Sequence, residues 1–213
     1  MSGGDDDFSK SGLSDPSPKH GSGDELDLPI LKMAERADWT LFRTLEGLAQ
    51  KAGVPPPLLR RLVLKELADN ALDAGAEVRF GLVDGQPRVY FIEDNGIGID
   101  GTPEEIAALF SIGRPLRSSK LVRMPQRGML GNGLRVVAGA VLVSGGSLTV
   151  VTRNRRIALR PEADGSTSIV EVSEADRPVG TRIEIGLGSA LPSDSDPFVW
   201  VRLAQSLVGK GET

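Results

Sequence analysis

Lys65-Glu66-Leu67-Ala68-Asp69-Asn70-Ala71-Leu72-Asp73-Ala74 is the stretch from which the fold of this chain is best predicted. Apolar residues recur at three- and four-residue steps over 58–74, which predicts a helix. Glu66, Asn70 and Asp73 are spaced i, i+4 and i+7, so they share one stripe of that helix. Taken alone, this stripe is more typical of a solvated helix face than of a binding site, and the segments downstream decide between the two.

The composition indicates one globular domain with a tail. The 213 residues are 39% hydrophobic and 25% charged, which suits a soluble domain with a sizeable core. There are no cysteines, so neither disulfides nor thiolate zinc sites are available. No apolar run has the length of a membrane span and the N-terminus does not resemble a signal peptide. We therefore expect a cytoplasmic protein without membrane contact.

The first 27 residues are expected to be a disordered acidic tail. They are rich in Gly, Ser, Pro and Asp and hold seven acidic and two basic residues, whereas the rest of the chain is nearly neutral. The only histidine, His20, lies in this tail, where nothing would fix its geometry. The domain itself is expected over residues 28–190, followed by a C-terminal helix and tail over 191–213.

The sequence of the first half of the domain predicts helices followed by a β-hairpin. Gly53 and Gly75 are typical helix ends, and a run of three prolines after Val54 is compatible with a helix start. The expected elements are helices over 28–52 and 58–74, strands over 78–82 and 87–92 joined by a tight turn at Asp84-Gly85, and a short helix from the N-cap Thr102 to near Phe110.

Asp94-Asn95-Gly96-Ile97-Gly98 follows the second strand. Asn-Gly after a strand is a turn signal on its own. A run of glycines behind a carboxylate also lets a flat ligand approach the backbone, while the carboxylate accepts hydrogen bonds from an exocyclic amine. The pattern is therefore compatible with a turn alone or with a nucleotide-base site.

Residues 111–127 hold five basic residues and no acid, and they precede the run Gly128-Met129-Leu130-Gly131-Asn132-Gly133-Leu134. The basic segment is either a solvated loop or a lid that approaches phosphates. A Gly-x-x-Gly-x-Gly run that opens an apolar helix offers backbone amides to an anion. It is not a Walker-type loop, because no Gly-Lys-Ser/Thr follows.

The sequence of the remainder of the chain predicts β-strands and one last amphipathic helix over 196–208. Strands are expected over 140–144, 147–152, 156–160, 168–172 and 181–185, and their short connections favour an antiparallel meander. The whole order predicts an α+β fold, a two-layer α/β sandwich with a mostly antiparallel mixed sheet and helices on one face.

The four motifs together resemble the ATP-binding motifs of the GHKL superfamily of topoisomerase ATPase subunits, heat-shock chaperones, mismatch-repair ATPases and histidine kinases. They are Glu66-x3-Asn70-x2-Asp73, Asp94-Asn95-Gly96-x-Gly98, Gly128-x2-Gly131-x-Gly133 and Gly180-Thr181. Within this superfamily, the segments Lys65 to Ala74 and Ser119-Lys120-x-x-Arg123 look most like those of the B subunit of topoisomerase VI. The resemblance implies a Bergerat ATP-binding fold, with ATP as the bound nucleotide and Mg²⁺ as its metal ion.

The resemblance also implies roles for individual residues. Glu66 would be the general base for water, Asn70 would ligate Mg²⁺, and Asp73 would support that helix and the nucleotide edge. Asp94 would accept the adenine amino group, with Gly96 and Gly98 making room for the ring and Thr181 completing the contact. The phosphates would be held by Lys120 and the Gly-rich run, that is by Gly128, Gly131, Asn132, Gly133 and Leu134.

Two functions remain open. One is a Mg²⁺-dependent ATPase whose nucleotide-driven homodimerisation serves a DNA-handling or defence-type machine, and the other is a nucleotide-binding switch that hydrolyses little. The hydrolytic branch usually adds a transducer domain with a lysine, which we expect a partner or a longer chain to supply. Autokinase activity is disfavoured because Glu66 is present. The cluster Arg153, Arg155, Arg156 and Arg160 leaves open phosphate-type contact with DNA beside plain solvated strand edges.

Overall fold

A computed structural model of the chain describes residues 38–74, 77–114 and 132–208. Contacts divide the chain into Met1–Glu35 and Arg36–Thr213, and the sheet and helices described below belong to the second unit. The predicted acidic tail with His20 lies outside the described residues, as do Lys120, Gly128 and Gly131. The proposed boundaries at residues 28 and 190 stay predictions.

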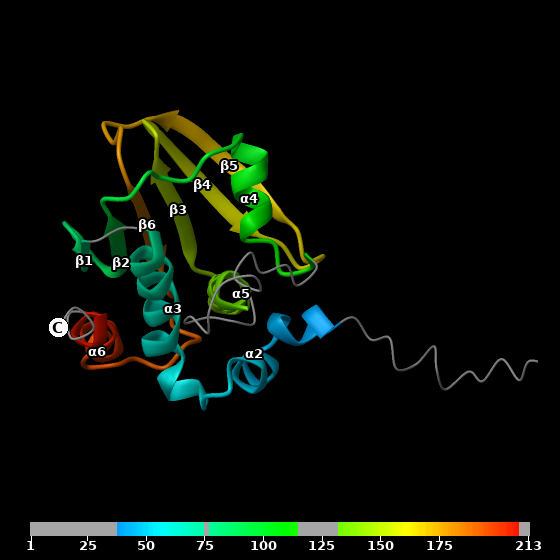
Figure 1. Cartoon of the computed structure of the whole chain (residues 1–213). Helices are drawn as coiled ribbons and strands as arrows, with labels where there is room; N and C mark the ends of the chain where they lie inside the picture. The colour runs from blue at the N-terminus through cyan, green and yellow to red at the C-terminus, as the bar shows by residue number, and fades with distance from the viewer. Residues whose placement is uncertain (1–37, 75–76, 115–131, 209–213) are drawn as a thin grey trace, which may run out of the picture. The chain divides into compact units, whose positions relative to one another are not determined.

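Six strands form a single sheet in the order β1-β2-β6-β3-β4-β5 (Figure 1). All the strand pairs of the described residues are antiparallel, and helices pack on the sheet, so the predicted α+β sandwich is confirmed. The bounds are β1 Val78–Val83, β2 Gln86–Asp94, β3 Ser147–Thr152, β4 Arg155–Pro161, β5 Thr167–Glu174 and β6 Thr181–Gly186.

The last strand does not continue the predicted meander. β3, β4 and β5 pair in chain order, but β6 crosses back and lies between β2 and β3. There Ile183 faces Ile92 on one side and Val150 on the other, so three apolar side chains share the helix-covered face. Burial of these side chains, which no local turn signal encodes, accounts for the crossover.

Five α-helices and two short 3₁₀ helices are present in the described part of the chain. They are the 3₁₀ helix Asp38–Arg43, α2 Leu45–Ala52, the 3₁₀ helix Pro56–Leu58, α3 Leu59–Ala74, α4 Pro103–Leu109, α5 Gly133–Ser144 and α6 Val199–Val208. None of these described helices is long and apolar enough to cross a membrane. The short helix after Thr102 is confirmed, with Thr102 and Glu105 forming a capping box.

Two of the predicted elements were wrong. The helix expected over 28–52 is interrupted at Thr44, whose hydroxyl accepts a hydrogen bond from the Gly47 amide at 3.1 Å and starts α2 afresh. The strand expected over 140–144 is the end of α5, which stops at Gly145 with φ +61°. A continuous apolar run does not separate a buried helix from a buried strand.

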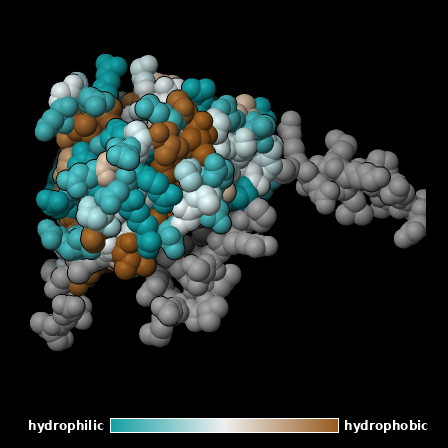
Figure 2. All heavy atoms as spheres, turned by 90° about the horizontal axis from the view of Figure 1, so that it is seen from above, coloured by the Kyte–Doolittle hydropathy of each residue, from teal (hydrophilic) through white to brown (hydrophobic). Residues whose placement is uncertain are grey.

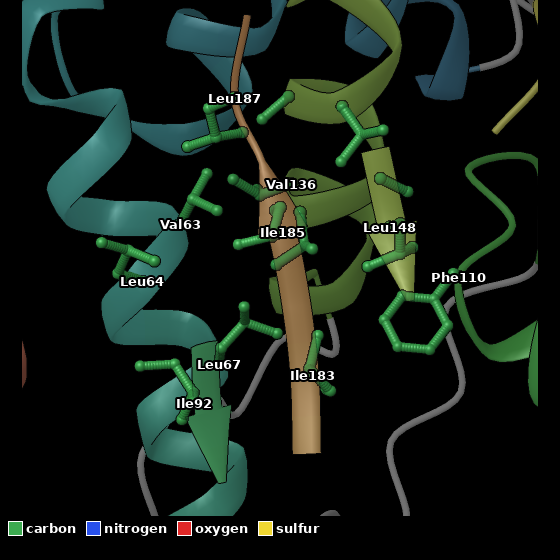
Figure 3. Packing of buried hydrophobic residues seen from close by; sticks show 14 of the residues in the cluster. Val63, Leu64, Leu67, Ile92, Phe110, Val136, Leu148, Ile183, Ile185 and Leu187 are labelled. Carbon is green, nitrogen blue, oxygen red and sulfur yellow. The ribbon is translucent and has the colours of Figure 1, made fainter. Parts of the chain in front are cut away.

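The core lies between one face of the sheet and the helices α3 and α5 (Figures 1 and 3). Val63, Leu64 and Leu67 of α3 are at most 1% exposed and point towards the sheet. Their three- and four-residue spacing is the periodicity from which the helix was predicted. The same helix carries Glu66 and Asn70 on a neighbouring stripe, so packing of α3 sets where those two side chains lie.

The opposite face of the sheet carries an ion-pair network. Glu93 pairs with Arg79 at 2.9 Å and with Arg182 at 3.1 Å, and the Arg182 guanidinium lies 4.0 Å above the Phe91 ring. Glu184 pairs with Arg182 and Arg156. Burial raises the pKa of Glu184, but the hydrogen bonds and charges of the two arginines outweigh it and hold the pKa below its ordinary value.

Arg60 fastens the segment that leads from β6 to α6. Arg60 is 7% exposed, and its guanidinium donates to the carbonyl oxygens of Leu187, Gly188, Leu191 and Pro192 at 2.8–3.2 Å. One side chain therefore satisfies four carbonyls that no helix or strand pairs.

Replacement of Arg60 by Met is expected to lower the free energy of unfolding by about 2–4 kcal/mol, because these carbonyls lose their charged donor. Urea unfolding followed by circular dichroism measures the change. Arg160→Met, at an exposed position of β4, is the matched control and should change it by less than about 0.5 kcal/mol. Equal effects of the two variants would contradict this role of Arg60.

Candidate functional site

Three backbone segments meet beside the C-terminal end of α3. The Gly180 amide donates to the Gly96 carbonyl at 2.8 Å, which joins the loop after β2 to the start of β6. A Cβ on Gly96 would lie 2.2 Å from the carbonyl oxygen of Ala74, and one on Gly180, where φ is +76°, would lie 2.0 Å from that of Asp94. Glycine is required at both positions because the backbones touch.

Asp94 stands where these segments meet. Its Oδ1 accepts hydrogen bonds from the amides of Gly96 at 2.9 Å and Thr181 at 3.3 Å, and the residue is only 7% exposed. Burial raises the pKa of the Asp94 carboxyl, and the two amides and Arg177 oppose the shift. Because both amides bind Oδ1, the second oxygen is left to accept a hydrogen bond from a ligand.

A cavity of about 170 Å³ opens next to Asp94. Its walls are mainly apolar, and its polar groups are few. The lining residues are Leu67, Asn70, Ala71, Ala74, Ile92, Asp94, Ile99, Phe110, Leu134, Thr181 and Ile183. Apolar walls with a few convergent polar groups are the usual construction of a small-molecule site.

Thr152 supports the loop after β2, a role that the sequence did not reveal. Its hydroxyl accepts from the Ile99 amide at 2.9 Å and donates to the Gly180 carbonyl at 3.2 Å, and the residue is fully buried. A Cβ on Gly98, where φ is +78°, would lie 2.8 Å from that hydroxyl oxygen. Gly98 therefore makes room for Thr152 and is not among the cavity-lining residues.

Glu66 reaches the N-terminus of α5. A Cβ added to Gly133, the first residue of α5, would lie 2.4 Å from Oε2 of Glu66, so carboxylate and helix end are in contact. One turn further along α3, the Asn70 amide nitrogen donates to the Glu66 carbonyl at 2.9 Å, which leaves the Asn70 carbonyl oxygen for other partners. Backbone amides at a helix N-terminus suit an anion such as phosphate.

The remaining predicted residues of the described chain are distributed around this end of the cavity. Asn132 directly precedes α5 and Leu134 lines the cavity, whereas Asp73 is exposed and does not line it. Lys120, Gly128 and Gly131 lie outside the described residues, so their predicted contacts with phosphates remain predictions. The structure thus brings together Glu66, Asn70, Asp94, Gly96, Gly133, Leu134 and Thr181.

The donor set suits a magnesium ion only when phosphates share in its coordination. The described residues hold no group of three or more His, Cys, Asp or Glu side chains that could bind a metal. The Asn70 carbonyl oxygen is a hard ligand, and Mg²⁺ usually takes one or two protein ligands together with phosphate oxygens and water. The arrangement therefore fits Mg²⁺ carried by a nucleotide.

Arg135 ties the start of α5 to the end of the segment after α4. Its side chain, 3% exposed, donates to the Ile112 carbonyl at 2.7 Å and to Asn132 Oδ1 at 3.3 Å, and it lies over the Phe42 ring at 4.8 Å. Burial lowers the pKa of Arg135, but a guanidinium stays protonated at neutral pH. In the sequence this arginine looked like any other basic residue.

The predicted basic cluster in the β3–β4 turn and in β4 makes contacts mainly within the chain. Arg153 pairs with Asp100 at 3.2 Å, Arg155 donates to the Gly101 carbonyl at 2.9 Å, and Arg156 pairs with Glu184 at 2.6 Å. Arg160 is exposed. These contacts favour the structural explanation of the cluster over phosphate binding.

Comparison with known proteins supports an ATPase family. Residues 56–188 match the family described as "Histidine kinase-, DNA gyrase B-, and HSP90-like ATPase". The chain is 33% identical over 125 residues to the DNA mismatch repair protein MutL of Tolumonas auensis and 35% identical over 126 residues to that of Shewanella amazonensis. Each match covers 58% of this chain and about a fifth of the relative's length.

Similar solved structures include the N-terminal domain of a DNA repair protein and the ATPase region of Saccharomyces cerevisiae topoisomerase II. The first has a TM-score of 0.40 at 21% identity, covering 70% of this chain and 39% of the other. The second has a TM-score of 0.44 at 13% identity, covering 68% and 42%.

The site and the family match together define a nucleotide-binding ATPase fold. Because the match extends over more than half of the residues, the chain belongs to the histidine kinase-, DNA gyrase B- and HSP90-like ATPase family. The superfamily predicted from the four motifs is therefore confirmed, and the residue roles within it stay predictions.

Replacement of Arg135 by Met is expected to loosen the first turn of α5, because Ile112 and Asn132 lose their common donor. Amide hydrogen exchange followed by mass spectrometry should show roughly tenfold faster exchange at residues 136–139, because Val136 carries the first amide of α5 that is bonded within the helix. Arg153→Met, which removes an exposed ion pair, is the control and should leave that exchange unchanged. This role of Arg135 would be refuted if α5 exchanged at the wild-type rate in Arg135→Met.

Proposed function

We propose that this chain binds ATP with Mg²⁺ and hydrolyses it. The main observation behind this proposal is that one helix, α3, supplies two of the side chains. Asn70 lines the cavity that also contains Asp94, and Glu66 lies against the N-terminus of α5. Asn70 thus shares the cavity with Asp94 and lies one helical turn from Glu66, which supports a base-binding role for Asp94, a metal-binding role for Asn70 and a role beside the phosphates for Glu66.

At the adenine end, Asp94 accepts the exocyclic amino group through the oxygen that the two amides leave unused. Thr181 lines the same cavity, and its hydroxyl completes the contact with the ring. Gly96 and Gly98 hold the loop after β2 close to α3 and β3, and this loop follows Asp94 at the edge of the cavity. These positions give selectivity for adenine over bases without an amino group at that site.

At the phosphate end, the amides of Asn132, Gly133 and Leu134 would bind phosphate oxygens, together with Lys120, Gly128 and Gly131. Asn70 would hold the magnesium ion, which neutralises charge on the phosphates. Glu66 would take a proton from the attacking water, and its contact with the α5 N-terminus supports a position beside the phosphates. Asp73, on the exposed side of the helix end, would support α3.

We further propose that ATP binding drives homodimerisation within a DNA-handling machine, with a partner or further domain supplying a lysine to the γ-phosphate. Similarity to MutL supports this role, although the chain spans about a fifth of those relatives. The Lys65–Ala74 motif supports closeness to the B subunit of topoisomerase VI. A rise of turnover per chain with protein concentration would support dimerisation, and tight binding with near-zero turnover at every concentration would identify a nucleotide switch instead.

Glu66→Gln is expected to retain ATP binding and to reduce turnover at least about a hundredfold, because the amide accepts no proton from water. Binding is measured by calorimetry and turnover by phosphate release. Glu171→Gln, at an exposed position of β5, is the control and should keep both. Turnover that persists in Glu66→Gln would show that another group activates the water.

Asp94→Asn is expected to weaken ATP binding roughly ten- to a hundredfold, because a charged acceptor for the amino group is lost. Folding should not suffer: burial raises the pKa of Asp94, so its ionised form opposes folding at neutral pH, and Asn keeps an acceptor for both amides. Calorimetry and thermal unfolding test the two statements, with Asp84→Asn in the β1–β2 turn as control.

The raised pKa also gives a pH dependence. Ionised Asp94 accepts the amino hydrogen, so wild-type affinity for ADP should fall as the pH is lowered towards that pKa, beginning at a higher pH than for an ordinary aspartate. The fall should be weaker in Asp94→Asn. A pH profile shared by wild type and variant would assign the dependence to another group.

A further inference from the structure

The β5–β6 segment, residues 175–180, carries an arginine that reaches the strand of Asp94. The Arg177 guanidinium donates to Oε2 of Glu93 at 2.5 Å, and Glu93 directly precedes Asp94 in β2. The same segment leads into Thr181, whose amide donates to Asp94 Oδ1 at 3.3 Å. Arg177 therefore bridges the two stretches of backbone between which Asp94 is held.

The backbone of the β5–β6 segment is held from its other side by Asn154 of the β3–β4 turn. The Asn154 amide donates to the Arg177 carbonyl at 2.8 Å, and Asn154 Oδ1 accepts from the Arg177 amide at 3.2 Å. Asn154 has a φ of +60°, a left-handed conformation that asparagine adopts more readily than most residues. The main chain at Arg177 is thus fixed without the guanidinium, so a change of this side chain leaves the segment attached to the turn.

The pair between Arg177 and Glu93 is shielded from solvent. The β5–β6 segment lies at the end of the sheet that is uppermost in Figure 1, and this end is turned towards the viewer in Figure 2, where the surface is largely hydrophilic with hydrophobic side chains in scattered patches. The Arg177 side chain is nevertheless only 19% exposed and that of Glu93 7%. Water screens such a pair less than it screens two exposed side chains, so the contact is stronger than most surface ion pairs.

We propose that Arg177 is a positioning residue for the base-binding end of the nucleotide site. Through Glu93 it holds the β5–β6 segment against the end of β2, which keeps the Thr181 amide on Oδ1 of Asp94 and leaves the second oxygen for the base. Of the two amides on Oδ1, that of Thr181 forms the longer bond, 3.3 Å against 2.9 Å for Gly96, so a displacement of the segment breaks it first. The inference rests on the proposed nucleotide site and adds a residue that does not line its cavity.

The charge of Arg177 acts on Asp94 in the same direction as its position. Burial raises the pKa of the Asp94 carboxyl, the amides of Gly96 and Thr181 and the Arg177 charge lower it, and the charge of Glu93 raises it. Arg177 thus favours the ionised carboxylate, in which both oxygens accept hydrogen bonds. Loss of the guanidinium removes this effect and also leaves Glu93 less completely neutralised.

A second arginine on Glu93 separates the proposed role from ion pairing as such. Arg79 donates to Glu93 Oε1 at 2.9 Å from the edge strand β1, and its side chain is 69% exposed. It shares the carboxylate with Arg177 but does not belong to the β5–β6 segment. Arg79→Met is therefore the matched control, because it removes an ion pair of Glu93 and leaves the link between this segment and β2 in place.

The first test needs no nucleotide. In the full chain labelled with ¹⁵N, the amide signals of Gly96 and Thr181 report the ionisation of Asp94, because both amides bind its carboxylate. In Arg177→Met the midpoint of their pH titration should lie at a higher pH than in the wild type, since a positive charge beside a buried carboxyl is lost. Arg177→Lys keeps the charge and should restore most of the wild-type midpoint, and Arg79→Met should titrate as the wild type does.

The second test measures ADP affinity by calorimetry at neutral pH. Arg177→Met should bind ADP roughly three- to tenfold more weakly than the wild type, with Arg177→Lys between the two and Arg79→Met unchanged. The inference is overturned if Arg177→Met binds ADP as the wild type does, or if Arg79→Met loses as much affinity and shifts the titration as far. If the wild type binds no ADP, the proposed function fails, and the amide titrations still decide whether Arg177 controls Asp94.

Discussion

Three backbone segments approach each other closely around Asp94, and the sheet and the cavity are both built on that contact. The end of α3, the loop after β2 and the start of β6 touch at Ala74, Gly96 and Gly180, and neither glycine could accommodate a Cβ. The contact holds Asp94 between two amides and fixes β6 beside β2. The cavity exists because these segments are held at backbone distance while the apolar side chains of α3 and the sheet surround the gap.

Different sides of helix α3 face three different environments: the core, the cavity and an apolar groove beside α6. Leu64 and Leu67 pack in the core, Asn70 reaches the cavity, and Asp69 lines the groove beside α6. Lys65 connects the groove with the side of α3 that carries Glu66, because its ammonium lies 2.6 Å from Asp69 and 3.8 Å from Glu66. A helix can divide its surface in this way since successive residues are rotated by about 100°. Its orientation is secured at the other end by Arg60, which anchors the segment that leads to α6.

Much of the backbone around the cavity could be predicted from sequence because its requirements are local, whereas the roles of the site residues stay predictions. A left-handed glycine, a capping box or a carboxylate at a strand end is specified by a few adjacent residues, as at Gly98 and Thr102. Thr152 and Arg135 escaped prediction because their partners are distant in the chain: Ile99 and Gly180 for one, Ile112 and Phe42 for the other. Residues 140–144 were wrongly predicted to be a strand, because a continuous apolar run has no hydrophobic periodicity that distinguishes a helix from a strand.

The class of fold, the four motifs and their order are encoded locally in the amino-acid sequence, since glycine, carboxylate and amide positions are set by backbone and chemical requirements of neighbouring residues. Three other facts became known only from the folded chain: β6 lies between β2 and β3, Glu66 meets Gly133, and Asp69 lines an apolar groove. They arise from packing between segments far apart in the chain. Burial stabilises such contacts without leaving a local pattern in the residues that make them.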